Sequence, residues 1–91
     1  MRLDLFLKAS RLVLRRTVAQ AMCDAGRVQV NNAVARSSRA VQVGDEIELR
    51  RGTRTLAVRV LTVPFLRQTS RQEASTLYEI VRSAKIPPDE L

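Results

Sequence analysis

Histidine and tryptophan are absent from the 91 residues, and cysteine occurs once, as Cys23. A single cysteine excludes an intrachain disulfide and a cysteine-based metal site, and it is typical of a protein from a reducing cytosol. The lack of histidine removes the usual acid–base group and metal ligand at neutral pH. Ser37 and Ser38 have no partner motif for nucleophilic catalysis. We therefore expect no enzyme activity, no metal and no cofactor.

Long apolar segments are also missing, since no run approaches the roughly 20 residues of a membrane span. Asp4, Lys8 and Arg11 interrupt the N-terminal segment, which argues against a signal peptide. These absences predict a cytoplasmic protein with no membrane partner.

Aromatic residues are scarce and comprise only Phe6, Phe65 and Tyr78. Phe6 and Tyr78 fit apolar faces, so we interpret both as core residues. A stacking platform of the kind found in single-strand nucleic-acid binders is therefore not expected.

Positive charge is abundant and unevenly distributed. The net charge is +7 and the sequence pI is about 11.3, and fourteen of the sixteen cations are arginine. Residues 1–39 carry a balance of +6, whereas residues 40–91 carry +1. Arginine presents a planar fork of donors that suits phosphate and base edges. The asymmetry predicts an N-terminal half that binds a polyanion and a C-terminal half with a structural role.

A short amphipathic helix is predicted at the N-terminus. Leu3, Phe6, Leu7 and Ser10 recur at positions i, i+3, i+4 and i+7, so these four residues define its buried face. Asp4 and Lys8 occupy the other side in the favourable acid-first order, together with Arg11.

A second helix is predicted to begin at Thr17, with Gln20 completing a capping box, and to end at Gly26. Its apolar stripe is expected to consist of Val18, Ala21, Met22 and Ala25. Two short helices joined by a basic turn resemble a helix-turn-helix in outline. We interpret Cys23 as a small core or flanking residue.

The remainder reads as short strands followed by a helix. Alternating residues predict four strands after Gly26, with Asn31 and Asn32 forming a tight turn because asparagine tolerates positive φ. Ser70 and Glu73 form a capping box, and the spacing over residues 74–81 predicts a C-terminal helix. The expected fold is α+β, with two short N-terminal helices packed on a small, mostly antiparallel sheet and a C-terminal helix. We expect one domain over 1–83, with a core module of about 1–50, and a flexible tail over 84–91.

The candidate binding residues are mostly cations on or beside the two predicted helices. Thr17 is included because the exposed amide groups of a helix start attract phosphate. The residues predicted to bind nucleic acid are Arg2, Asp4, Lys8, Arg11, Arg15, Arg16, Thr17, Arg27, Asn31, Arg36 and Arg39.

The order of these landmarks resembles a known RNA-binding module. The relevant segments are MRLD at 1–4, Phe6-Leu7, Arg15-Arg16-Thr17, Gly26-Arg27-Val28, Asn31 and Val43-Gly44-Asp45. Over residues 1–50 they resemble the fold named after small-subunit ribosomal protein four, also called the alpha-L fold. The MRLD start, the LKASRLVLRRT segment and the stretch Ser75–Ile80 extend the similarity over residues 1–82 to the RqcP family, relatives of heat-shock protein fifteen.

This resemblance implies an RNA clamp of ribosome-associated quality control. Members bind the large ribosomal subunit after a stalled ribosome splits, contacting ribosomal RNA and peptidyl-tRNA. They support the partner RqcH while it adds an alanine tail to the blocked chain. Arg2, Asp4 and Arg16 match family positions at the RNA surface. This chain departs from the family at Leu5, where a basic residue is usual, and at Asn32, where glycine is common.

Two alternatives remain from the sequence. The first is a heat-shock protein fifteen-like factor that recycles stalled large subunits without tailing, although that relative carries a basic C-terminal extension. The second is a helix-turn-helix DNA-binding regulator, which normally acts as a dimer and reads bases with polar side chains on its second helix. The second helix here is rich in alanine and offers few polar side chains that could read bases. We also expect a monomer.

Overall fold

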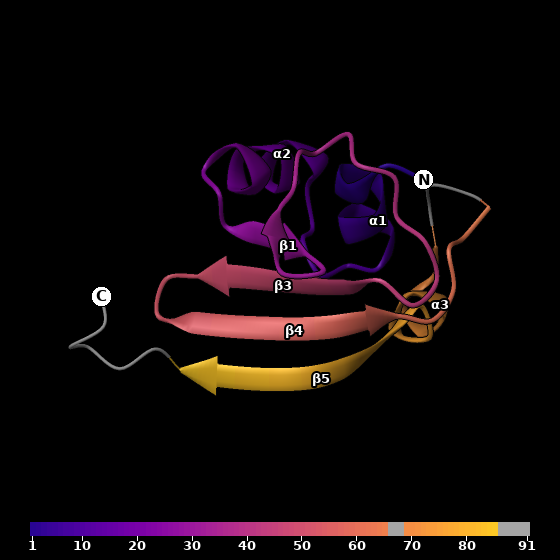
Figure 1. The fold of residues 1–91 in the computed structure, drawn as a ribbon. Helices are drawn as coiled ribbons and strands as arrows, with labels where there is room; N and C mark the ends of the chain where they lie inside the picture. Colours follow the sequence, from indigo (N-terminus) through magenta and orange to yellow (C-terminus); the bar gives the residue numbers. More distant parts are fainter. Residues whose placement is uncertain (66–68, 86–91) are drawn as a thin grey trace.

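The fold places helices against one antiparallel sheet. The computed structural model describes residues 1–65 and 69–85. In chain order its elements are α1 (Leu3–Ala9), α2 (Arg16–Asp24), β1 (Val28–Val30), β2 (Ala33–Val34), β3 (Glu46–Arg51), β4 (Arg54–Val60), α3 (Arg71–Ser75) and β5 (Tyr78–Lys85). The five strands lie in the order β2-β1-β3-β4-β5. Figure 1 shows α1 and α2 grouped beside β1 and β3, with β4 and β5 extending the sheet away from them. The predicted α+β class is confirmed.

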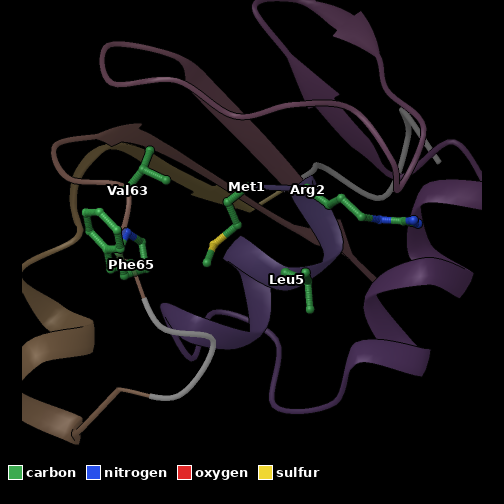
Figure 2. Close-up of a pocket in the computed structure, with 6 residues that line it drawn as sticks. Met1, Arg2, Leu5, Val63 and Phe65 are labelled. Carbon is green, nitrogen blue, oxygen red and sulfur yellow. The ribbon is translucent and has the colours of Figure 1, made fainter.

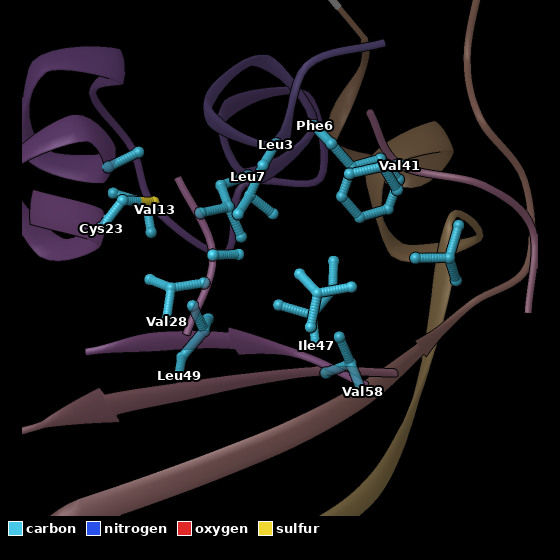
Figure 3. Close-up of a cluster of buried hydrophobic side chains, with 14 of the residues drawn as sticks. Leu3, Phe6, Leu7, Val13, Cys23, Val28, Val41, Ile47, Leu49 and Val58 are labelled. Atoms are coloured by element: carbon cyan, nitrogen blue, oxygen red, sulfur yellow. The ribbon is translucent and has the colours of Figure 1, made fainter. Parts of the chain in front are cut away.

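The core lies between α1 and the sheet. Leu3, Phe6 and Leu7 of α1 and Ile47 and Val58 of the sheet are all 0% exposed. Figure 3 shows these side chains meeting between the helix and the strands. The predicted apolar face of the first helix is confirmed, because the 3.6-residue period places these positions on one side.

The second helix buries a different face from the one predicted. Ala19, Met22 and Cys23 are buried, whereas Val18 is 43% exposed and Ala21 is also exposed. The expected stripe is therefore wrong, apart from Met22. The apolar residues of α2 cover roughly 200° of its circumference, at about 100° per residue, which is wider than the face that contacts α1, so periodicity alone does not select the buried side. The interpretation of Cys23 as a core residue is confirmed.

The tight turns follow the residue types. Asn31 and Asn32 have φ values of 51° and 71°, which confirms the predicted turn between β1 and β2. Gly26 follows α2 with φ of 73°, the left-handed conformation expected of a helix terminator. Asn31 also ties this turn to β3: its amide donates to Asp45 at 3.1 Å, and its side-chain oxygen accepts from the Glu46 amide at 3.0 Å.

The predicted helix over residues 74–81 is wrong in extent. The helix α3 ends at Ser75, and Tyr78–Lys85 instead forms β5, which pairs antiparallel with β4. The predicted cap is present, since the Ser70 hydroxyl accepts from the Glu73 amide at 3.1 Å. The free edge of β4 provides hydrogen-bond partners that a longer helix would leave unused, and such non-local pairing overrides a helical period.

The C-terminal end of the described chain is a strand. β5 continues through Ala84 and Lys85, which pair with Thr55 and Arg54 of β4. Residues 86–91 of the predicted tail lie outside the described residues. No helix within 1–65 and 69–85 has the length and apolar character that crossing a membrane requires.

Candidate nucleic-acid interface

A buried carboxylate joins the first turns of α1 and α2. The Asp4 side chain is 0% exposed. It accepts hydrogen bonds from Arg2 Nε at 3.2 Å, from Arg16 Nε at 3.1 Å and from Gln20 Nε2 at 2.9 Å. The Leu5 amide donates to it at 2.8 Å, and Arg2 Nη2 makes a longer bond of 3.4 Å. A buried charge is tolerated when it is paired and hydrogen-bonded in this way.

The ionised form of Asp4 is favoured by these partners. Burial alone would raise the pKa of this carboxyl, but the hydrogen bonds from Gln20, Arg16 and Arg2 outweigh burial and hold the pKa below its ordinary value of 3.8. Asp4 therefore carries its charge at neutral pH and anchors both arginines.

This lowered pKa predicts an acid-dependent stability. Because the folded pKa lies below the unfolded value of about 3.9, ionised Asp4 stabilises the fold above about pH 4, and this contribution is lost as the pH falls through the folded pKa. The variant Asp4→Asn lacks it throughout. Thermal unfolding of both proteins from pH 7 to pH 2.5 should show a stability gap that closes towards the acid end. A gap that stays constant across this range would contradict the assignment.

Arg2 and Arg16 remain available to solvent despite their bonds to Asp4. Their side chains are 45% and 38% exposed, respectively. Among the described residues, the Arg16 side chain bonds only through Nε, which leaves its terminal nitrogens free to donate. Because one carboxylate pairs with two guanidinium groups, the cluster of Asp4, Arg2 and Arg16 keeps a net positive charge. Asp4 thus fixes the direction of the two arginines without neutralising them.

The loop over residues 36–39 adds two exposed arginines to this end of α1. The Leu3 amide donates to the Arg39 carbonyl at 2.8 Å, and the Asp4 amide donates to the Ser37 carbonyl at 3.1 Å. These bonds satisfy amide groups at the helix start that lack intrahelical partners. They also hold Arg36 and Arg39 next to the Asp4 cluster, and both side chains are exposed.

The start of α2 differs from the predicted cap. The helix begins at Arg16, with Arg15 as the N-cap and no side chain bonded to the amides there. The predicted capping box of Thr17 and Gln20 is wrong, because the Gln20 amide group donates to Asp4 on the neighbouring helix. Thr17 is exposed in the first turn. Open backbone amides beside two arginines provide a favourable place for phosphate.

The structure therefore gathers part of the predicted set and separates the rest. We name the gathered residues the N-terminal cationic surface: Arg2, Arg15, Arg16, Thr17, Arg36 and Arg39. Asp4 was predicted to contact RNA, and its complete burial corrects this role to one of positioning. Gln20 was missed as the fourth side chain of the cluster; its position four residues after Arg16 on α2 is the one available sequence signal.

No hydrogen bond among the described residues joins the remaining predicted residues to this surface. Lys8 is exposed in the last turn of α1, and Arg11 donates to the Thr69 carbonyl at 3.1 Å. Arg27 follows the far end of α2. Asn31 is exposed but occupied in the turn contacts described above.

Two of the three aromatic residues, Phe6 and Tyr78, were interpreted from the sequence as core residues, and the structure agrees. Phe6 is buried, and Tyr78 is partly buried against the core. Phe65 is fully exposed at a pocket of about 570 Å³ that Met1, Leu5 and Val63 also line. Figure 2 shows the Arg2 side chain pointing away from Phe65, so the guanidinium belongs to the cationic surface rather than to this apolar pocket.

Comparison with known proteins places this geometry in a family. Residues 1–47 match the S4 domain. The chain is 44% identical over 91 residues to the RQC P-site tRNA stabilizing factor of Halalkalibacterium halodurans, covering 99% of this chain and 100% of the relative. It is 41% identical over 86 residues to the factor of the same name from Streptococcus pneumoniae, covering 94% and 96%.

A solved structure agrees with these matches. The trimeric structure of Vibrio cholerae heat shock protein 15 superposes with a TM-score of 0.81 at 31% sequence identity, covering 89% of this chain and 81% of that chain. The resemblance identified from the sequence is confirmed: this chain belongs to the S4-domain family of RQC P-site tRNA stabilizing factors.

Proposed function

We propose that this chain is a non-catalytic factor of ribosome-associated quality control that binds large ribosomal subunits and stabilises the tRNA in their P site. The relatives at 41% and 44% identity carry the name of such a factor, and they match this chain over nearly their full lengths. The S4 domain over residues 1–47 contains the whole N-terminal cationic surface. The protein acts in the cytoplasm, where its ribosomal partners are.

One observation carries the proposal: a buried carboxylate holds Arg2 and Arg16, whose side chains stay 45% and 38% exposed. Fixed guanidinium groups bind phosphate oxygens with charge-assisted hydrogen bonds at a reduced entropic cost. Phosphate contacts recognise shape rather than base sequence, which suits a folded RNA. We propose that the surface contacts large-subunit ribosomal RNA and peptidyl-tRNA, and that the bound factor supports RqcH during alanine tailing.

Cosedimentation tests this function. Tagged protein is recovered from cells, and its RNA and protein partners are resolved on sucrose gradients. We expect it in the fraction of free large subunits, together with peptidyl-tRNA. Recovery with genomic DNA instead would support the helix-turn-helix alternative and contradict the proposal. The exposure of Val18 and Ala21 on α2 already disfavours base readout by that helix.

The similarity to heat shock protein 15 favours one further candidate, a factor that recycles stalled large subunits without tailing. Removal of the protein separates the two functions. Loss of alanine tails on stalled nascent chains supports tailing, whereas unchanged tails with accumulated large subunits carrying peptidyl-tRNA support recycling. We also propose that this chain is a monomer, in contrast to the trimeric Vibrio structure, and light scattering tests this difference.

A further inference from the structure

Three cations form a row across one end of the sheet. Arg51 of β3 is the direct partner of Arg54 of β4, and Arg54 is the direct partner of Lys85 of β5. In the same register Leu49 pairs with Leu56, two residues before Arg51 and two after Arg54. Side chains two residues apart on a strand share a face. We name Arg51, Arg54 and Lys85 the sheet-end row, and it lies on the face that the helices cover further along.

The row carries positive charge without internal compensation. All three residues are exposed. Within residues 1–65 and 69–85, none of the four ion pairs involves a member of the row. Neighbouring strands lie about 4.8 Å apart, so the row spans about 10 Å. Like charges placed directly opposite each other in a sheet are destabilising, and a bound polyanion would relieve this repulsion.

The opposite face of the same strands provides a contrast. Arg59 of β4 pairs with Glu79 at 2.8 Å, and Arg82 of β5 pairs with Glu46. These two cations of that face are thus compensated by carboxylates. The row on the helix-covered face has no such carboxylate partner among the described residues.

The surroundings of the row also suit an RNA backbone. Arg51 and Arg54 border a groove of about 240 Å³, whose other side is formed by Leu12 from the segment between α1 and α2. Thr55 and Ser83 also belong to its lining. Arg27 and Arg50 border a separate depression of about 320 Å³. Leucine side chains line the groove beside Arg51 and Arg54, and the arginine forks at its edge are suited to contact phosphate oxygens.

We propose that the sheet-end row is a second RNA-binding surface, which contacts backbone phosphates of the large subunit or of its P-site tRNA. This inference rests on the proposed function and extends it to the half of the chain for which the sequence predicts only a structural role. Two separated contact surfaces would clamp the RNA from both ends of the domain.

The salt dependence of binding tests the row. Affinity of the full chain for purified large subunits, with and without P-site tRNA, is measured between 50 and 200 mM salt, values chosen around the range where phosphate contacts dominate. The double variant Arg51→Gln/Arg54→Gln is expected to bind about tenfold more weakly at the lower salt. Its slope of log K against log salt should be shallower by about 1.5, since each lost phosphate contact removes about 0.7–0.9.

The matched control is Arg59→Gln/Arg82→Gln, which removes the same charge from the opposite face and should leave the slope near that of the native chain. If the native chain binds and Arg51→Gln/Arg54→Gln has the same slope of log K against log salt, the proposal that the row binds RNA is overturned. The row is then solvated charge at the end of the sheet, and the proposed function still stands. Absence of binding by the native chain would overturn the proposed function as well. A loss seen with and without tRNA assigns the contact to ribosomal RNA, and a loss confined to tRNA-carrying subunits assigns it to tRNA.

Discussion

Replacement of Arg2 and Arg16 together by glutamine is expected to weaken binding to large ribosomal subunits about 100-fold. Each guanidinium offers terminal donors held in a fixed direction by Asp4. A hydrogen bond to a charged group contributes about 1.5–3 kcal/mol, so the loss of two corresponds to at least two orders of magnitude in affinity. Equilibrium binding to purified subunits carrying P-site tRNA measures the effect.

A control must separate the loss of contacts from the loss of fold, because both arginines also pair with a buried carboxylate. The variant retains the hydrogen bonds from Gln20 and from the Leu5 amide to Asp4, and we expect it to remain folded with a stability lower by about 1–3 kcal/mol. Circular dichroism verifies the fold. The single variant Arg59→Gln removes an exposed cation from the sheet face opposite the helices and should bind within about threefold of the native chain, given the small worth of one screened charge. Native-like binding by the folded double variant would contradict the account.

The local part of the fold could be predicted from the sequence. The first helix has an apolar face set by its own periodicity, and Leu3, Phe6 and Leu7 are buried as predicted. The Asn31-Asn32 turn follows from the tolerance of asparagine for positive φ. Each of these features depends on residues within one or two turns of the chain.

Non-local pairing decided the features that the sequence prediction missed. The residues of β5 have a helical spacing, and only the free edge of β4 makes them a strand. The sheet-end row depends on the register of three strands and on the irregularity between Ala57 and Val58, which no local pattern encodes.

The candidate site divides in the same way. Its cations could be found by charge, but the role of Asp4 depends on Arg16 and Gln20, which lie 12 and 16 residues away on another helix. From the sequence, Arg16 reads as a surface residue whose replacement by alanine weakens ribosome association while changing stability by less than about 0.5 kcal/mol. Its bond to a buried carboxylate raises the expected cost to about 1–3 kcal/mol.

The second large effect is expected from the variant Asp4→Asn. In our proposal Asp4 itself does not contact RNA. Its side chain is fully buried, so it acts only by directing Arg2 and Arg16. An asparagine amide presents one donor face to groups that are themselves donors, and it cannot accept from all of them. The arginines would then sample more directions, and each would lose part of the entropic advantage of a fixed donor. We expect binding to large subunits to weaken about tenfold.

This variant separates orientation from charge, because it raises the net charge from +7 to +8. If overall charge governs binding, Asp4→Asn binds more tightly than the native chain. If a buried carboxylate orients the arginines, it binds more weakly. The decisive measurement is therefore the affinity of folded Asp4→Asn for large subunits carrying P-site tRNA, compared with the native chain at one ionic strength. We predict about a tenfold loss, and equal or tighter binding would contradict the account.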